Sequence, residues 1–197
     1  MKKHYLWLYW AAVTLFWIGV AIVMIGHYIN FGAYNIMEYT ISRQVGRARW
    51  SEILFAAVNV IVGIAIAFFV RKNALRWGLT KRLEKLMYAT IIFFFLVSFV
   101  PYDPVLGTVV AHRILAGLMM STAAIFAMIV LVKNHWTRSI INLISGVSLW
   151  IIGVITAILF FIFTDTFWDI IFCIETSYVI GFFVFLPTIP AKIELKS

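Results

Sequence analysis

The chain has 197 residues, of which 64% are hydrophobic and 12% are charged, and its mean hydropathy is +1.02. A water-soluble domain of this length needs far more polar surface, so the composition excludes a soluble globular protein and indicates a bilayer protein. The net charge of +8 does not favour nucleic-acid binding, because the cations lie close to the ends of apolar segments.

Six apolar segments are long enough, or nearly so, to cross a bilayer as helices, which requires about 20 residues each. In chain order they cover residues 5–28, 51–70, 86–100, 105–132, 139–163 and 167–188. The first is too long for the apolar part of a signal peptide, and the third is short enough to need an added interfacial turn. Continuous apolarity without two-residue alternation favours helices over a β-barrel. We therefore expect one all-α domain over 1–197, a polytopic integral membrane protein with a six-helix transmembrane bundle.

Lys and Arg are unequally distributed between the two predicted sides of the membrane. One side carries twelve of the 16: Lys2, Lys3, Arg71, Lys72, Arg76, Lys81, Arg82, Lys85, Lys133, Arg138, Lys192 and Lys196. The positive-inside rule therefore predicts that both termini are cytoplasmic. The densest part of this set, loop 71–85, is expected to rest against anionic lipid head groups.

Polar residues at the predicted helix starts have a structural interpretation. Three pairs are expected to cap helices or to complement the helix dipole: Ser51 with Glu52, Asp103 with Pro104, and Thr166 with Asp169.

Four polar residues lie deeper in their segments and call for partners inside the bundle. Asn59, His112, Arg113 and Glu175 follow the outer ends of their segments by seven or eight residues. At about 1.5 Å per residue this places all four roughly 11–12 Å below the outer boundary. A charge facing lipid there costs at least about 2.5–3.5 kcal/mol. We expect Arg113 to pair with Glu175, with His112 and Asn59 completing the hydrogen bonds and Tyr178 on the same face.

This layer supports three functional interpretations. The first is an outward-facing pocket that binds a lipid or small amphiphile without catalysis; Arg113 would hold a phosphate or carboxylate, and Arg43, Arg47, Arg49 and Asp103 would form the rim. The second is a lipid-modifying hydrolase or transferase in which His112 is the base, Glu175 orients it, and Ser98 or Tyr102 is the nucleophile. The third is a structural or regulatory subunit in which the layer is a polar clamp.

The sequence indicates no metal site and no cofactor. The four histidines, His4, His27, His112 and His135, are scattered, with His27 near the surface at the outer end of the first span, and zinc-binding spacings are absent. Gly-rich phosphate loops and nucleophile elbows are also missing. The single Cys173 lies in an apolar run and is expected to be an inert packing residue.

Two stretches resemble a known family. YTISRQVGRARWSEILFAAVNVIVGIAI and VPYDPVLGTVVAHRILAG are similar to the damage-regulated autophagy modulator family, in which an Ile-Ser-rich loop precedes an acidic helix start and a mid-helix Asn. Ser42, Glu52 and Asn59 occupy those places here, and Glu175 before aromatic residues also fits. The Arg-rich first loop and the Arg after His112 differ from the eukaryotic pattern and favour a microbial relative. The resemblance implies a six-span protein of a microbial cell membrane, with cytoplasmic termini, a polar outer-leaflet constellation and a role in lipid homeostasis.

Overall fold

The computed structural model describes residues 3–31, 41, 45–46, 48–100, 102, 107–133, 139–162 and 168–190. Over these residues the elements are all α-helices, and no strand occurs. They are α1 (Lys3–Phe31), α3 (Arg49–Asn73), α4 (Lys81–Phe99), α5 (Val109–Lys133), α6 (Ile140–Ile162) and α7 (Trp168–Thr188). The predicted all-α class is confirmed.

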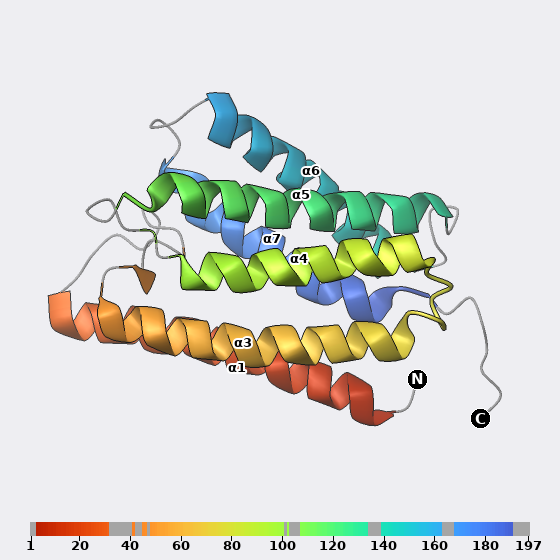
Figure 1. Cartoon of the computed structure of the whole chain (residues 1–197), viewed down its shortest axis with the longest axis horizontal. Coiled ribbons are helices and arrows are strands. Elements are labelled where there is room, and N and C mark those ends of the chain that lie inside the picture. Colours follow the sequence, from red (N-terminus) through yellow and green to blue (C-terminus); the bar gives the residue numbers. More distant parts are fainter. Residues whose placement is uncertain are drawn as a thin grey trace.

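Helices that are neighbours along the chain are also neighbours in space. α1 packs on α3, α3 on α4, α4 on α5, α5 on α6, and α6 on α7, and successive helices run in opposite directions (Figure 1). As a result α1 begins and α7 ends at the same end of the bundle, which we call the terminal end. At the opposite, distal end α3 and α5 begin and α4 ends.

Two helix starts differ from the predicted ones by four residues or more. α4 begins at Lys81 rather than at 86, because the Thr80 side chain accepts a hydrogen bond from the Leu83 amide at 3.4 Å and caps the helix. The first five residues of α4, four of which are charged, extend the short apolar run to a helix of 19 residues, as the expected added turn would. α5 begins at Val109 rather than at 105, and the expected cap of Asp103 with Pro104 lies outside the described residues.

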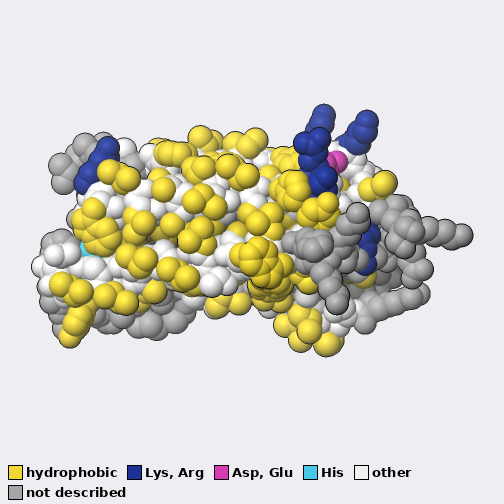
Figure 2. Space-filling view, turned by 90° about the horizontal axis from the view of Figure 1, so that it is seen from below, with side chains coloured by type: hydrophobic (Ala, Val, Ile, Leu, Met, Phe, Trp, Pro, Cys, Tyr) yellow, Lys and Arg dark blue, Asp and Glu magenta, His cyan; other side chains and the backbone are white. Residues whose placement is uncertain are grey.

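Apolar side chains cover the bundle between its two ends. Large hydrophobic residues are exposed on successive helices, including Ile29 of α1, Ile64 of α3, Ile114 of α5 and Ile144 of α6. On the face shown in Figure 2, Lys and Arg lie toward the two ends, with hydrophobic side chains filling the region between them. Within the described residues, three helices are long and apolar enough to cross a membrane: Tyr5–Asn30, Arg49–Asn73 and Val109–Lys133. This surface is the one expected of a helical membrane protein.

The terminal end is tied together by hydrogen bonds to α7. Pro187 lies inside α7 and has no N–H to donate to the Phe183 carbonyl four residues earlier. The Tyr9 hydroxyl of α1 donates to that carbonyl instead, at 2.8 Å. Asn142 of α6 donates through Nδ2 to the Phe185 carbonyl at 3.3 Å and to Thr188 Oγ1 at 3.2 Å. These contacts join α1 and α6 to the last turns of α7.

Candidate functional site

A cavity of about 410 Å³ lies in the distal half of the bundle, between the first half of α3 and the last turn of α4. We call it the distal cavity. Its polar lining residues are Arg49, Glu52, Asn59, Ser98, Tyr102 and His112, and most of the others are apolar. The volume and the mixture of an apolar wall with a few polar groups are typical of small-molecule sites.

Asn59 is the most buried polar residue of the cavity lining. Its side chain is 2% exposed, and Nδ2 donates to Ser98 Oγ of α4 at 2.7 Å. The Ser98 hydroxyl in turn donates to the Phe94 carbonyl at 2.8 Å, which fixes the direction of the chain of hydrogen bonds. Asn59 Oδ1 is buried and has no hydrogen-bond partner. Such a buried, unpaired atom costs about 1–3 kcal/mol, so a donor that reached it from the neighbouring cavity would be bound favourably.

His112 lines the cavity and bonds to the backbone through one of its two ring nitrogens. Its Nδ1 lies 2.5 Å from the carbonyl oxygen of Val100, the C-cap residue of α4, so the proton of the neutral ring is on Nδ1. This contact satisfies one of the carbonyls that a helix end leaves unpaired. The ring also packs edge-on against Tyr102, with centroids 5.7 Å apart. Nε2 is then a hydrogen-bond acceptor on a side chain that lines the cavity.

The four predicted residues do not follow the starts of their helices by equal numbers of residues. Asn59 follows the start of α3 by ten residues, whereas His112 follows the start of α5 by three. The expected common layer rested on a start of the fourth span at 105, and the later start moves His112 and Arg113 into the first turns of α5. Asn59 and His112 nevertheless line the same cavity, because the helices are staggered along the bundle.

Arg113 and Glu175 have different neighbours. Arg113 Nη2 donates to the Tyr102 hydroxyl at 2.9 Å, and the guanidinium carbon lies 5.7 Å from the centre of the Tyr102 ring. Glu175 Oε2 accepts a hydrogen bond from the Ile41 amide at 2.6 Å. The contacts of the described residues do not include the expected ion pair between Arg113 and Glu175. Neither residue lines the distal cavity, so the predicted role of Arg113 as its anion-binding group does not fit this geometry.

Tyr178 belongs to a separate, apolar cavity. Its hydroxyl donates to the Met120 carbonyl at 2.6 Å, and its side chain is buried. The neighbouring space is about 40 Å³ and is lined almost entirely by apolar side chains of α3, α4, α5 and α7. Tyr178 therefore links α7 to α5 and does not extend the site around Asn59.

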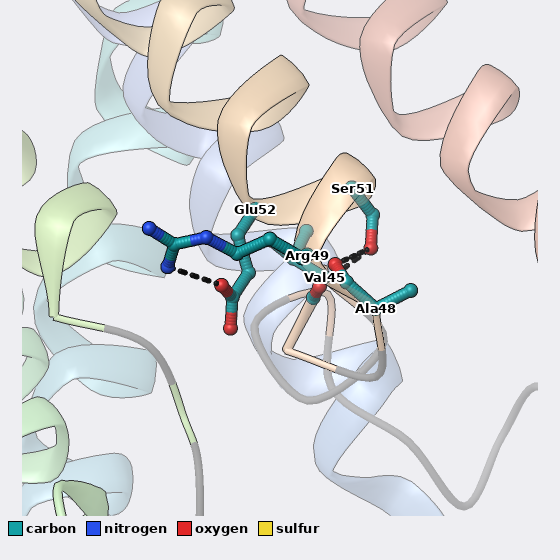
Figure 3. A network of polar contacts seen from close by, with 5 residues as sticks. All are labelled: Val45, Ala48, Arg49, Ser51 and Glu52. Atoms are coloured by element: carbon teal, nitrogen blue, oxygen red, sulfur yellow. Dashed lines mark hydrogen bonds and ion pairs between the residues drawn. The ribbon is translucent and has the colours of Figure 1, made fainter. Parts of the chain in front are cut away.

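The start of α3 forms one wall of the distal cavity. Figure 3 shows the polar contacts of this helix start. Arg49 Nη1 lies 3.2 Å from Glu52 Oε2, with side chains 82% and 16% exposed, respectively. Ser51 points to the other side, where its hydroxyl lies 2.7 Å from the carbonyls of both Val45 and Ala48. Ala48 is the N-cap residue, so the predicted capping role of Ser51 is wrong, whereas Glu52 does lie in the first turn.

Of the predicted rim residues, Arg49 lines the distal cavity. Arg43, Arg47 and Asp103 lie outside the described residues, as does Thr166 of the third expected cap.

Sequence reasoning missed two features. Glu52 was assigned to the helix dipole alone, yet it lines the cavity, and its position about two turns before Asn59 on α3 was the available signal. His27 lies near the end of α1, as expected, but the sequence did not show that its side chain is fully buried, with its ring centre 5.5 Å from that of Trp50. Nothing in the sequence indicated that α1 would present His27 to the start of α3.

The geometry supports binding better than catalysis. The described contacts orient His112 through Val100, whereas Glu175 contacts Ile41, so the base and orienter of a hydrolase are not brought together. Ser98, the candidate nucleophile, bonds to Asn59 and Phe94. In the described part of the chain, no group of three or more His, Cys, Asp and Glu residues is placed to hold a metal ion.

Comparisons of the chain with protein-family models, with curated proteins and with solved structures found no match. The resemblance to the damage-regulated autophagy modulator family thus stays a prediction.

Proposed function

We propose that the chain is a six-span protein of a microbial cell membrane that binds a lipid or small amphiphile in the distal cavity, without catalysing a reaction, and serves lipid or membrane homeostasis. The observation that best supports this proposal is the distal cavity, a space of about 410 Å³ in an apolar bundle that is lined in part by the buried Asn59. Polar groups inside a membrane protein that line a cavity are functional-site candidates by default.

The proposed topology places both termini in the cytoplasm. It is supported by the excess of Lys and Arg at the terminal end, where Arg71, Lys72, Lys81, Arg82 and Lys85 are exposed. Single cysteines introduced in a Cys173→Ser chain and labelled in intact cells with an impermeant maleimide test this. A cysteine at Thr80 should be labelled only after lysis, and a cysteine at Gly107 before it; the reverse pattern would invert the topology.

The binding proposal is tested with photoreactive amphiphiles. Diazirine-tail analogues of a fatty alcohol, a fatty amine and an alkyl phosphate are applied together to the protein in phosphatidylcholine nanodiscs. Cross-links should concentrate on the cavity-lining parts of α3 and α4. Ala56→Trp, which fills the cavity, should reduce this labelling by about tenfold, a loss of 1.4 kcal/mol.

The matched control is Ala21→Trp, which adds the same side chain on an exposed position of α1. Labelling that is unchanged in Ala56→Trp, or that is equally spread over the apolar surface, would favour the structural subunit in which the polar groups only hold helices together.

We also propose that the basic segment 71–85 contacts anionic head groups. Lys72 Nζ lies 5.3 Å from the centre of the Phe68 ring and 5.8 Å from that of Tyr5, which holds this cation at the edge of the apolar surface. Thermal stability should be higher in phosphatidylglycerol nanodiscs than in phosphatidylcholine ones. The difference should shrink when Lys81, Arg82 and Lys85 are changed to Gln, and a difference that persists would contradict the assignment.

A further inference from the structure

We infer that the distal cavity selects an uncharged amphiphile whose head carries hydroxyl groups, such as a glycerol or sugar head, over phosphate, carboxylate or amine heads. The inference rests on the proposed function and specifies its ligand. At the polar lining residues some donors and acceptors are already bonded within the chain, and only the remaining ones can bind a ligand.

On the two buried polar residues of the lining, Asn59 and His112, the side-chain atoms left without a described partner are acceptors. Asn59 uses its N–H on Ser98 and leaves Oδ1 without a partner. His112 uses Nδ1–H on Val100 and leaves the Nε2 lone pair. Glu52 adds carboxylate oxygens at the mouth. A ligand with O–H donors would satisfy these atoms, whereas a phosphate or carboxylate would face them with lone pairs against lone pairs.

The charges around the cavity disfavour an ionic head. Arg49 and Glu52 are paired at 3.2 Å and largely cancel each other at the mouth. An ionic head at the depth of Asn59 and His112 would lose its hydration without meeting an unpaired charge in the described lining, which is costly at this depth. A neutral head avoids this cost.

The rest of the wall suits a hydrocarbon tail. Phe55, Val60, Val97 and Phe99 line the space next to Asn59, and Ala56 and Ala57 leave room beside them. A head held at Asn59 and His112 would therefore continue into a chain lying between α3 and α4.

The test is a competition series with matched tails. Monolaurin, its diacetate, dodecylamine and dodecyl phosphate each compete with a diazirine-tail monoacylglycerol for the distal cavity in phosphatidylcholine nanodiscs, whose head groups offer no donor. Monolaurin should compete at about tenfold lower mole fraction than dodecyl phosphate and the diacetate, with dodecylamine in between. The diacetate has the same tail and no O–H, so its weakness isolates the donors.

Asn59→Leu should weaken monolaurin about tenfold while leaving the diacetate unchanged, since only the first uses Oδ1. Asn142→Leu is the matched control: it also removes a buried amide with an unpartnered Oδ1, but Asn142 does not line this cavity. Circular dichroism and thermal unfolding of both variants verify that they fold.

The outcomes separate the two proposals. If dodecyl phosphate or dodecylamine equals monolaurin, or if Asn59→Leu weakens all four compounds alike, the selectivity for hydroxyl heads is overturned and the binding site stands. If none of the four displaces the probe from α3 and α4, the proposed binding function fails together with it.

Discussion

Two of the buried asparagines of the bundle, Asn59 and Asn142, make an instructive comparison. Asn59 is 2% exposed and Asn142 is fully buried; in each, Nδ2 has a partner on a neighbouring helix while Oδ1 has none. The surroundings differ. Asn59 opens on the distal cavity, whereas Asn142 lies among close contacts between α6 and the end of α7. An unpaired amide oxygen is therefore not a site in itself, and the space beside it decides what it can do.

The space around two glycines also differs, between the surroundings of Asn142 and the distal half of α5. A Cβ added at Gly146, one turn after Asn142, would lie 2.7 Å from Phe185 Cε2 and 2.8 Å from Leu131 Cδ1. A Cβ added at Gly117, five residues after His112, would meet no heavy atom within 4 Å. The terminal half of the α5, α6 and α7 layer is closed, and the distal half of α5 is open.

The largest change in the free energy of unfolding is expected from substitutions of Gly146 and Gly117. Gly146→Ala should lower the free energy of unfolding by about 1–3 kcal/mol, because Leu131 and Phe185 must move. Gly117→Ala should raise it by roughly 0.5–1 kcal/mol, because alanine favours the helix and meets nothing. Denaturant unfolding in micelles measures both. Equal effects at the two sites would remove the contrast between a closed and an open half.

A smaller effect is expected at the proline of α7. Tyr9→Phe should lower the free energy of unfolding by about 1 kcal/mol, because the Phe183 carbonyl loses its donor. Pro187→Ala restores an N–H four residues later, so Tyr9→Phe should cost much less in that background. A double-mutant cycle should then show a coupling of at least about 0.5 kcal/mol. Simple additivity would mean that the tyrosine does not substitute for the missing helix bond.

The smallest expected change in stability concerns two serines, whose hydroxyl groups each donate to a carbonyl one turn earlier in their own helix. Ser98→Ala should cost about 0.6 kcal/mol, a typical value for a hydrogen bond between membrane helices, because Asn59 Nδ2 loses its acceptor. Ser145 donates to the Ile141 carbonyl of its own helix, and Ser145→Ala should change stability very little. Thermal unfolding of both variants in nanodiscs checks the pair. If Ser145→Ala lowers the stability more than Ser98→Ala does, the hydrogen bond between α3 and α4 is not needed to hold the cavity wall.

The individual polar residues show how far sequence reasoning reached. Asn59 and His112 were predicted to share a pocket, and both line the distal cavity. Their predicted companions Arg113 and Glu175 have other neighbours, and Tyr178 faces another cavity. One predicted boundary was wrong: the fourth span starts at Val109 and not at 105, so the depths assigned to His112 and Arg113 were off by about one turn.

The sequence by itself determined the all-α class, the apolar helices and the choice of buried polar residues, because the transfer of side chains from water is a local property of each segment. The tertiary structure decided which of those residues meet. Each residue turns a helix by about 100°, so a small change in where a helix starts, how it is rotated or how it is staggered assigns a side chain to a new neighbour. That is why Arg113 faces Tyr102 and why Asn59, rather than Asn142, faces a space large enough for a ligand.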